Sequence, residues 1–164
     1  MVTVTTLSGE SAAQLNRRFA QGSLPIWDAL NGNCDGQFLA WNDELSWPAW
    51  LALRIARAVL FDWRGWAGKR FVLSWRDAHN ARGWNRFPLQ GADEDLCYPF
   101  AICRAQAFCD QKPALRLDYT RYPNIMRRIQ DDLRQIDEKL WLGKMWLRWR
   151  GRYVFVGFFA LSKA

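Results

Sequence analysis

The C-terminal segment 153–161 constrains the fold more than any other feature of the sequence, because it is apolar on both alternating faces. One face carries Val154, Val156 and Phe158, and the other carries Tyr153, Phe155 and Phe159. Successive side chains of a strand point in opposite directions, so such a strand must be covered on both sides. The interior of a β-barrel can cover one side, and a helix or a second subunit can cover the other. The segment is therefore compatible with a homodimer but does not require one.

Further segments alternate with the two-residue period of half-buried strands. They are residues 37–41, 70–76, 83–87, 97–109, 114–119 and 142–149. Turn residues separate several of these segments, at Asp77–Asn80, at Lys112-Pro113 and at Arg150-Gly151. A series of antiparallel strands with few helices predicts a closed barrel or a strongly curled sheet.

Other segments have helical spacing instead. They are residues 11–20, 46–60 and 123–138. Ser46 is a suitable N-cap for the second of them. The third contains Arg127–Asp131 and Arg128–Asp132, which are spaced as surface ion pairs one helical turn apart.

These patterns predict an α+β, mainly β fold. The 164 residues fit one domain better than two. We expect residues 1–62 to form a lead-in of mostly helices and turns and residues 63–164 to supply the barrel strands. The helix over 123–138 would then be inserted before the last hairpin.

Large aromatic side chains are frequent, with 11 Trp, 10 Phe and 4 Tyr. A Trp side chain is costly to leave in water, and its indole N–H needs a partner when it is buried. So many rings in a short chain indicate a core or a cavity with aromatic walls.

The cysteines and the single histidine exclude several kinds of site. Cys34, Cys97, Cys103 and Cys109 form no CxxC pair, and His79 cannot complete a zinc site alone. His79 also lies in a predicted turn, which argues against a Ser-His-Asp or Cys-His centre. The sequence therefore predicts no metal site and no cofactor.

The N-terminal segment and the lengths of the apolar runs predict a cytoplasmic protein, and the net charge bears on its partners. The net charge is +7, but no run of five basic residues forms an arm or a tail. The first ten residues lack the charged start and apolar block of a signal peptide. The longest apolar run, residues 154–161, is too short to span a membrane.

Several short motifs occur in an order that resembles a known family. They are Gly36-Gln37-Phe38, then residues 66–71, 117–119, 142–145 and 158–161. Their order resembles the GXWXG-type family of small bacterial proteins, with the element order of a lipocalin-like (calycin-type) barrel over residues 36–161. The chain has Phe38 and Ala40 where the family signature has Trp and Gly. The resemblance implies a cavity for an apolar ligand.

Candidate site residues follow from a barrel of this kind. The predicted cavity walls are Trp66, Trp75, Trp84, Tyr119 and Met145. Arg86 or Arg104 would anchor a polar group of the ligand, although arginines of a barrel also commonly lie on its outer face.

Asp118 and Tyr119 are the candidate acid–base residues. They are neighbours at the end of a predicted strand, so only one of them can face the cavity. An inward Asp118 would have a raised pKa, and an inward Tyr119 would donate a hydrogen bond to a carbonyl. The alternative for Asp118 is a carboxylate that caps the following turn.

Three functions are compatible with these features. The leading hypothesis is a barrel that binds a hydrophobic small molecule bearing an anionic or carbonyl group. The second is a cofactor-free cyclase or isomerase of a polyketide-like substrate, in which Asp118 or Tyr119 moves a proton. The third and least favoured is nucleic-acid binding by the hairpin that carries Trp146, Arg148, Arg150 and Arg152.

Overall fold

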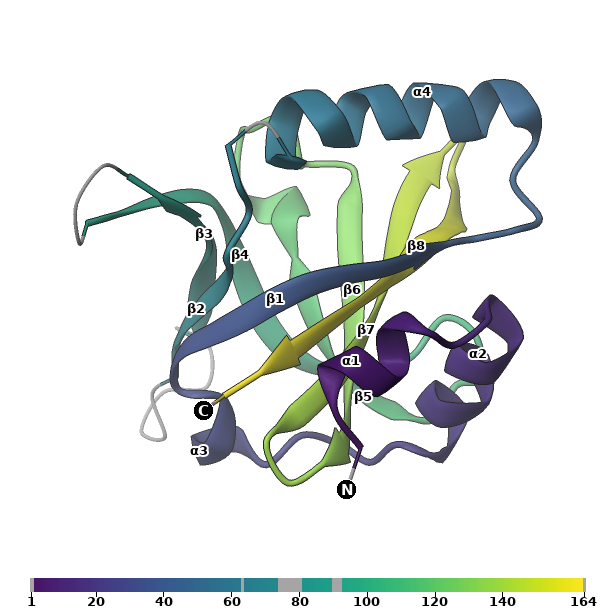
Figure 1. The fold of residues 1–164 in the computed structure, drawn as a ribbon. Helices are drawn as coiled ribbons and strands as arrows, with labels where there is room; N and C mark the ends of the chain where they lie inside the picture. The colour runs from purple at the N-terminus through teal and green to yellow at the C-terminus, as the bar shows by residue number, and fades with distance from the viewer. Residues whose placement is uncertain (1, 63, 74–80, 90–92, 164) are drawn as a thin grey trace.

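A computed structural model describes residues 2–62, 64–73, 81–89 and 93–163. Within these residues, eight antiparallel strands form a closed barrel in which sequence neighbours pair and β8 returns to β1 (Figure 1). The strands are β1 (Gly32–Trp41), β2 (Gly68–Val72), β3 (Arg82–Pro88), β4 (Glu94–Gln106), β5 (Pro113–Asp118), β6 (Ile129–Asp137), β7 (Leu140–Trp149) and β8 (Arg152–Ser162). The predicted antiparallel barrel is confirmed.

Short helices lie at both ends of the barrel (Figure 1). They are α1 (Val4–Ser8), α2 (Ala12–Gln21), α3 (Trp27–Leu30) and α4 (Trp47–Arg57). Ser11 begins α2 with a capping box, in which its side chain and that of Gln14 bond each other's backbone N–H. Helix α4 crosses the end opposite α3 and continues into the π-helical turn Ala58–Asp62. None of the described helices is both long enough and apolar enough to cross a membrane.

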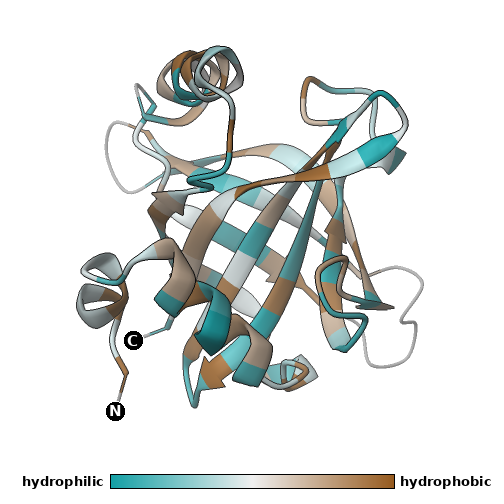
Figure 2. Ribbon diagram, turned by 90° about the vertical axis from the view of Figure 1, so that its right-hand side faces the viewer, coloured by the Kyte–Doolittle hydropathy of each residue, from teal (hydrophilic) through white to brown (hydrophobic). Residues whose placement is uncertain are grey.

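Strand β8 is covered on both faces, as its sequence requires. Phe159 and Leu161 belong to the apolar cluster inside the barrel. Phe158 and Ala160 face outward and pack with Phe19 of α2. The sequence analysis named a helix or a second subunit as the outer cover of this strand. In the structure, helices provide it. Figure 2 shows hydrophilic and hydrophobic residues alternating along several strands of the wall.

The last hairpin turns at Arg150-Gly151, as predicted. Both residues have left-handed backbone angles, with φ of 47° and 81°. Positive φ at both central positions is the geometry whose twist matches a two-residue hairpin. Trp149 and Arg152 consequently pair across the turn.

The predicted helix over 123–138 is wrong, because most of this segment forms β6. Its charged residues suggested a solvated helix face with ion pairs along the segment. In the structure Asp131 and Asp132 are buried and paired with other strands, Asp131 with Lys69 and Asp132 with Arg116, whereas Arg127 and Arg128 are exposed. A partner that is distant in the sequence leaves no local pattern, so helical spacing was the stronger signal.

The predicted lead-in over residues 1–62 also needs correction. It contains β1, which pairs with β2 on one side and β8 on the other and thereby closes the barrel. Gly36 and Gly68 allow β1 and β2 to approach closely at this seam. A Cβ atom on Gly36 would lie 2.6 Å from the Cα of Gly68 and 2.6 Å from the Trp66 ring.

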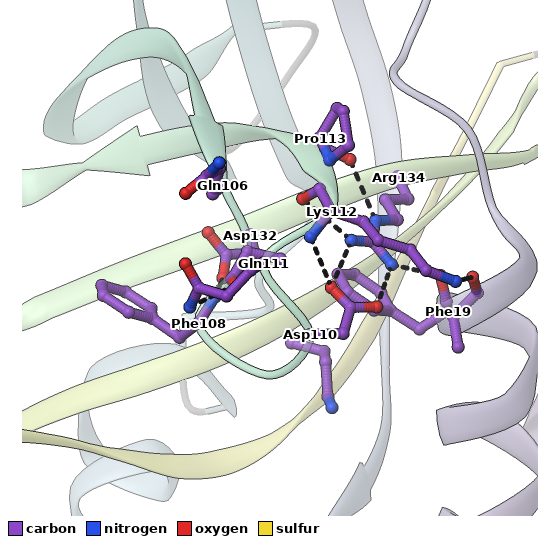
Figure 3. A network of polar contacts seen from close by, with 12 residues as sticks. Phe19, Gln106, Phe108, Asp110, Gln111, Lys112, Pro113, Asp132 and Arg134 are labelled. Atoms are coloured by element: carbon purple, nitrogen blue, oxygen red, sulfur yellow. Dashed lines mark hydrogen bonds and ion pairs between the residues drawn. The ribbon is translucent and has the colours of Figure 1, made fainter.

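A buried arginine fastens α2 to the barrel (Figure 3). The Arg134 guanidinium is fully buried and binds both carboxylate oxygens of Asp110 at 2.6 and 2.7 Å. It also donates to the Phe19 carbonyl at the end of α2, at 3.0 Å. Its remaining hydrogen bonds reach the carbonyls of Lys112 and Pro113 in the β4–β5 connection. One side chain therefore joins β6, the connection and α2.

Replacing this arginine should destabilise the protein strongly. We expect Arg134→Met to lower the free energy of unfolding by about 3 kcal/mol, because it leaves Asp110 and several carbonyls without their donor. Arg17→Ala, an exposed position in α2, is the matched control and should change it by less than about 0.5 kcal/mol. Urea denaturation measures both variants, and equal losses would contradict the role of Arg134.

Candidate functional site

The interior of the barrel contains a cavity of about 650 Å³ towards the end crossed by α4. Volumes of this size are typical of small-molecule sites. Most of the wall is apolar and aromatic, with contributions from Phe38, Trp41, Phe61, Trp66, Met145 and Phe159. The cavity is therefore suited to an apolar molecule.

Helix α4 and the turn after it form one border of this cavity. Leu53, Ala56 and Arg57 of the helix line it. The Arg57 guanidinium lies 4.0 Å from the centre of the Phe38 ring and donates to Asp62 at 3.0 Å. Arg57 therefore holds the end of α4 against β1 and the following turn.

Four buried polar residues also line the cavity, and we call them the polar cluster: Lys69, Asn85, Tyr119 and Asp131. Lys69 and Asn85 are direct partners across β2 and β3. Tyr119 directly follows β5, and Asp131 lies in β6. Strand alternation turns all four side chains inward, where they lie next to the apolar core.

The Lys69 ammonium group is surrounded by acceptors. Its Nζ donates to Asn85 Oδ1 at 3.1 Å and to Tyr119 Oη at 2.5 Å, and it lies 3.2 Å from Asp131 Oδ2. An ammonium has three protons to donate, so these contacts use its full capacity. Lys69 is consequently the centre of the polar cluster.

Asn85 holds the polar cluster in one orientation. Its Oδ1 accepts from Trp66 Nε1 at 3.1 Å as well as from Lys69. Its Nδ2 donates to Tyr119 Oη at 3.1 Å and to the Tyr98 carbonyl at 3.4 Å. Because donors surround one end of the amide and acceptors the other, the side chain cannot be reversed without losing its hydrogen bonds.

Burial shifts the pKa values of the polar cluster towards its neutral forms. Loss of solvation lowers the pKa of Lys69 and raises that of Asp131, while their mutual attraction opposes both shifts. Burial, followed by the nearby Asp131 charge, raises the pKa of Tyr119 well above its ordinary value. Asp131 Oδ1 is buried and has no hydrogen-bond partner among the described residues. The arrangement can therefore exchange a proton internally and still accept one more polar contact.

Only some of the predicted wall residues are found in the cavity lining. Trp66, Tyr119 and Met145 line the cavity. Trp84 does not, since it neighbours the inward Asn85 and packs with Arg82, whose guanidinium lies 5.3 Å from its ring. Trp75 lies outside the described residues.

The two predicted arginine anchors do not line the cavity. Arg86 is buried, but it is held by Glu94, by Asp35 and by the Cys34 carbonyl. Arg104 is exposed. The outer-face alternative considered for these arginines describes both of them better.

Asp118 ends β5 and Tyr119 directly follows it, and their side chains point to different environments. Tyr119 is the one that lines the cavity. Asp118 caps the following turn, accepting from the backbone and hydroxyl of Thr120 and from Gln130. Burial alone would raise the pKa of Asp118, but these hydrogen bonds outweigh it and lower the pKa. Asp118 is thus poorly suited to the acid–base role.

The sequence hypothesis missed Lys69, Asn85 and Asp131 as a group. Lys69 lies two positions before Phe71, so the same alternation that places Phe71 in the core also turns Lys69 inward. That signal was available in the sequence. Asp131 had no such signal, because its segment was expected to be helical.

Two other expectations concern metals and nucleic acid. Across the described ranges, no group of three His, Cys, Asp or Glu side chains could hold a metal ion. In the basic hairpin, Arg148, Arg150 and Arg152 are exposed, but Trp146 is buried between Phe108 and Phe155. Trp146 is therefore not available as the stacking platform on which the nucleic-acid hypothesis depended, and the exposed ring of this hairpin is Trp149 instead.

Comparison with known proteins supports the fold. No protein-family model and no curated protein matches the chain. A solved structure described as a protein from Thermomonospora curvata is similar, with a TM-score of 0.56 and 15% sequence identity. The match covers 94% of this chain and 88% of that one. At this identity the likeness shows the fold alone. The barrel fits a lipocalin-like architecture, and membership of the GXWXG-type family is not confirmed.

The Lys69–Asp131 pair should be strongly coupled in stability. We expect Lys69→Met and Asp131→Leu each to lower the free energy of unfolding by about 3 kcal/mol, because each leaves one buried partner unpaired. The double variant removes both charges, so it should lose clearly less than the sum of the two.

Guanidinium denaturation of the four proteins at neutral pH measures this coupling. The loss in Lys69→Met should also grow as the pH rises, because the remaining carboxyl has a raised pKa and is tolerated only while it is protonated. Strictly additive losses would refute the coupling.

Proposed function

We propose that the barrel binds an apolar small molecule that carries one carbonyl or carboxyl group. The apolar body would occupy the cavity, and the polar group would bind at the polar cluster. The observation that carries this proposal is a set of buried donors, centred on Lys69, in the wall of an otherwise mainly apolar cavity.

The chemistry of the polar cluster favours an oxygen-bearing ligand. Lys69 Nζ and Tyr119 Oη are donors whose protons now go to other members of the polar cluster, and a carbonyl or carboxylate oxygen is the acceptor that would replace one of these partners. The unpaired Asp131 Oδ1 adds a group that can donate when protonated or accept when ionised. A purely hydrocarbon ligand would leave this oxygen unpaired, at a cost of about 1–3 kcal/mol.

The anchor in this proposal differs from the one expected from the sequence. Lys69 and Tyr119 replace Arg86 and Arg104, because only the former pair lines the cavity. Trp66 is both a wall residue and a support, since its indole N–H holds Asn85 in place. Met145 pairs with Asp131 across β6 and β7 and lines the cavity beside the polar cluster, where it would contact the apolar part of the ligand.

A second candidate function is a proton-transfer enzyme, such as a cyclase or isomerase. The specific observation in its favour is the chain from Asp131 Oδ2 through Tyr119 Oη, 3.5 Å away, to Asn85 and Lys69. A carboxyl with a raised pKa beside a buried hydroxyl can move a proton next to a bound carbonyl. Asp131 takes the role that the sequence hypothesis gave to Asp118.

Binding can be tested with ligands of matched chain length. Decanoate and decanal should displace the apolar fluorophore N-phenylnaphthylamine from the protein, whereas decane should displace it poorly. Lys69→Met should weaken decanoate binding about tenfold or more, equivalent to about 1.4 kcal/mol. Fluorescence titration measures the affinity.

Two further variants make this test decisive. Tyr119→Phe keeps the ring and the charge pair, so it should be folded and should also weaken decanoate binding. Arg104→Met, at an exposed position outside the cavity, should leave the affinity unchanged. Unchanged affinity in both Lys69→Met and Tyr119→Phe would rule out the polar cluster as the anchor.

The enzymatic candidate predicts proton exchange in a bound ketone. Wild-type protein in deuterated water should speed the incorporation of deuterium next to the carbonyl of methyl octyl ketone. Asp131→Asn should abolish this effect, because the amide cannot take up the proton. Asp118→Asn should retain it, because Asp118 caps a turn outside the cavity. NMR or mass spectrometry follows the exchange, and an uncatalysed rate with wild type would leave binding as the sole function.

A further inference from the structure

We propose that Lys69 forms a reversible imine with the carbonyl carbon of an apolar aldehyde bound in the cavity. This inference rests on the proposed function, because it requires that an apolar carbonyl compound enters the barrel. It goes further in assigning a covalent step to one amine and a chemical class, the aliphatic or aromatic aldehydes, to the ligand.

The surroundings of the Lys69 amine support covalent capture. The residue lines the cavity although its side chain is only 4% exposed. Its Nζ lies 5.1 Å from the ring centres of Phe100 and Phe159 and 5.7 Å from that of Trp66. An imine formed there would be shielded by these rings from the water that hydrolyses it.

The position of Lys69 distinguishes it from three other described lysines. Lys144 is also buried, but it lies outside the cavity lining and bonds Asn16 at 2.6 Å. Lys112 is exposed, and Lys163 binds the carbonyls of Ala29 and Asn31 at the opposite end of the barrel from α4. Lys69 alone among these combines burial with access to the cavity.

The protonation state also suits a nucleophile. An amine attacks a carbonyl only in its neutral form, and an exposed lysine is almost fully protonated at neutral pH. Burial lowers the pKa of Lys69, which raises its neutral fraction. Asp131 and Tyr119 are close enough to receive or return the proton that the amine gives up.

The reaction balances without any other reactant. The Lys69 nitrogen forms a bond to the aldehyde carbon, and the C=O π electrons move to the oxygen, which takes a proton from Asp131 or Tyr119. The resulting carbinolamine then loses its oxygen as water, with a second proton that derives from the amine. The products are one C=N bond and one water molecule. Ionised Asp131 is then the counterion of the protonated imine.

Aldehydes fit this site better than ketones or acids. An aldehyde carbon carries a single chain, so it can approach an amine that Asn85, Tyr119 and Asp131 already enclose on three sides. A carboxylate can bind the same donors but cannot form an imine under these conditions. Imine formation therefore distinguishes an aldehyde ligand from a carboxylate that only binds the same donors.

Reductive trapping tests the proposal. The full chain is incubated with decanal at neutral pH, reduced with borohydride and analysed by intact mass and peptide mapping. We expect one decyl group per chain, located on Lys69, with little labelling elsewhere. Labelling should persist at pH values where exposed lysines hardly react, because the pKa of Lys69 is lowered.

Controls separate this inference from the proposed function. Lys69→Arg should lose the adduct, whereas Lys112→Arg should keep it. In wild type, decanol should compete with labelling without forming an adduct, which keeps the test independent of how well the variant folds. Labelling that spreads over exposed lysines and spares Lys69 would overturn the imine. If decanoate still displaced the fluorophore in that case, the binding function would stand. Loss of both would refute both.

Discussion

The constraint on which this barrel depends is that each buried charged side chain must find a partner within the protein. Lys69, Arg86, Arg134 and Lys144 are all nearly inaccessible to solvent, and each has a hydrogen-bonding partner. Removing the partner of a buried ion costs several kcal/mol, so a mispaired strand would be penalised heavily. These contacts also join elements that are distant in the chain. Inside the barrel the same constraint produces the polar cluster, whose pairing is complete except for one carboxylate oxygen.

The barrel was predictable from the sequence because its strands follow simple alternation. The two-sided apolar character of β8 required an interior on one face and a cover on the other, and both are present. The Arg150-Gly151 turn was predictable from its short, glycine-containing connection between apolar runs. In contrast, the sequence of β6 predicts a helix, because its buried Asp131 and Asp132 have the composition of a solvated surface. Their partners lie in β2 and β5, and nothing within the segment reveals them.

The candidate site was only partly predictable for a related reason. Trp66, Tyr119 and Met145 could be proposed because large or polar side chains in barrel strands are natural wall residues. The choice of arginine as anchor rested on its chemistry rather than on strand parity. Parity would have turned Lys69 inward with Phe71, and the strand that carries Arg86 would then present its neighbour Asn85 to the same interior. The identity of an inward residue thus depends on register, which a single strand does not supply.

The pairing of β1 with β8 closes the wall of the cavity and differs from the other strand pairs in its loop-closure entropy. The other strand pairs connect strands that are neighbours in the sequence, with α4 between β1 and β2, whereas this pair must bring together segments separated by most of the chain. Its loop-closure entropy is a single large step. Phe38 and Phe159 are direct partners across this pair, and both also line the cavity. The enclosing wall is consequently completed by the strand pair with the largest loop to close, so the binding space depends on the contact that is entropically most costly.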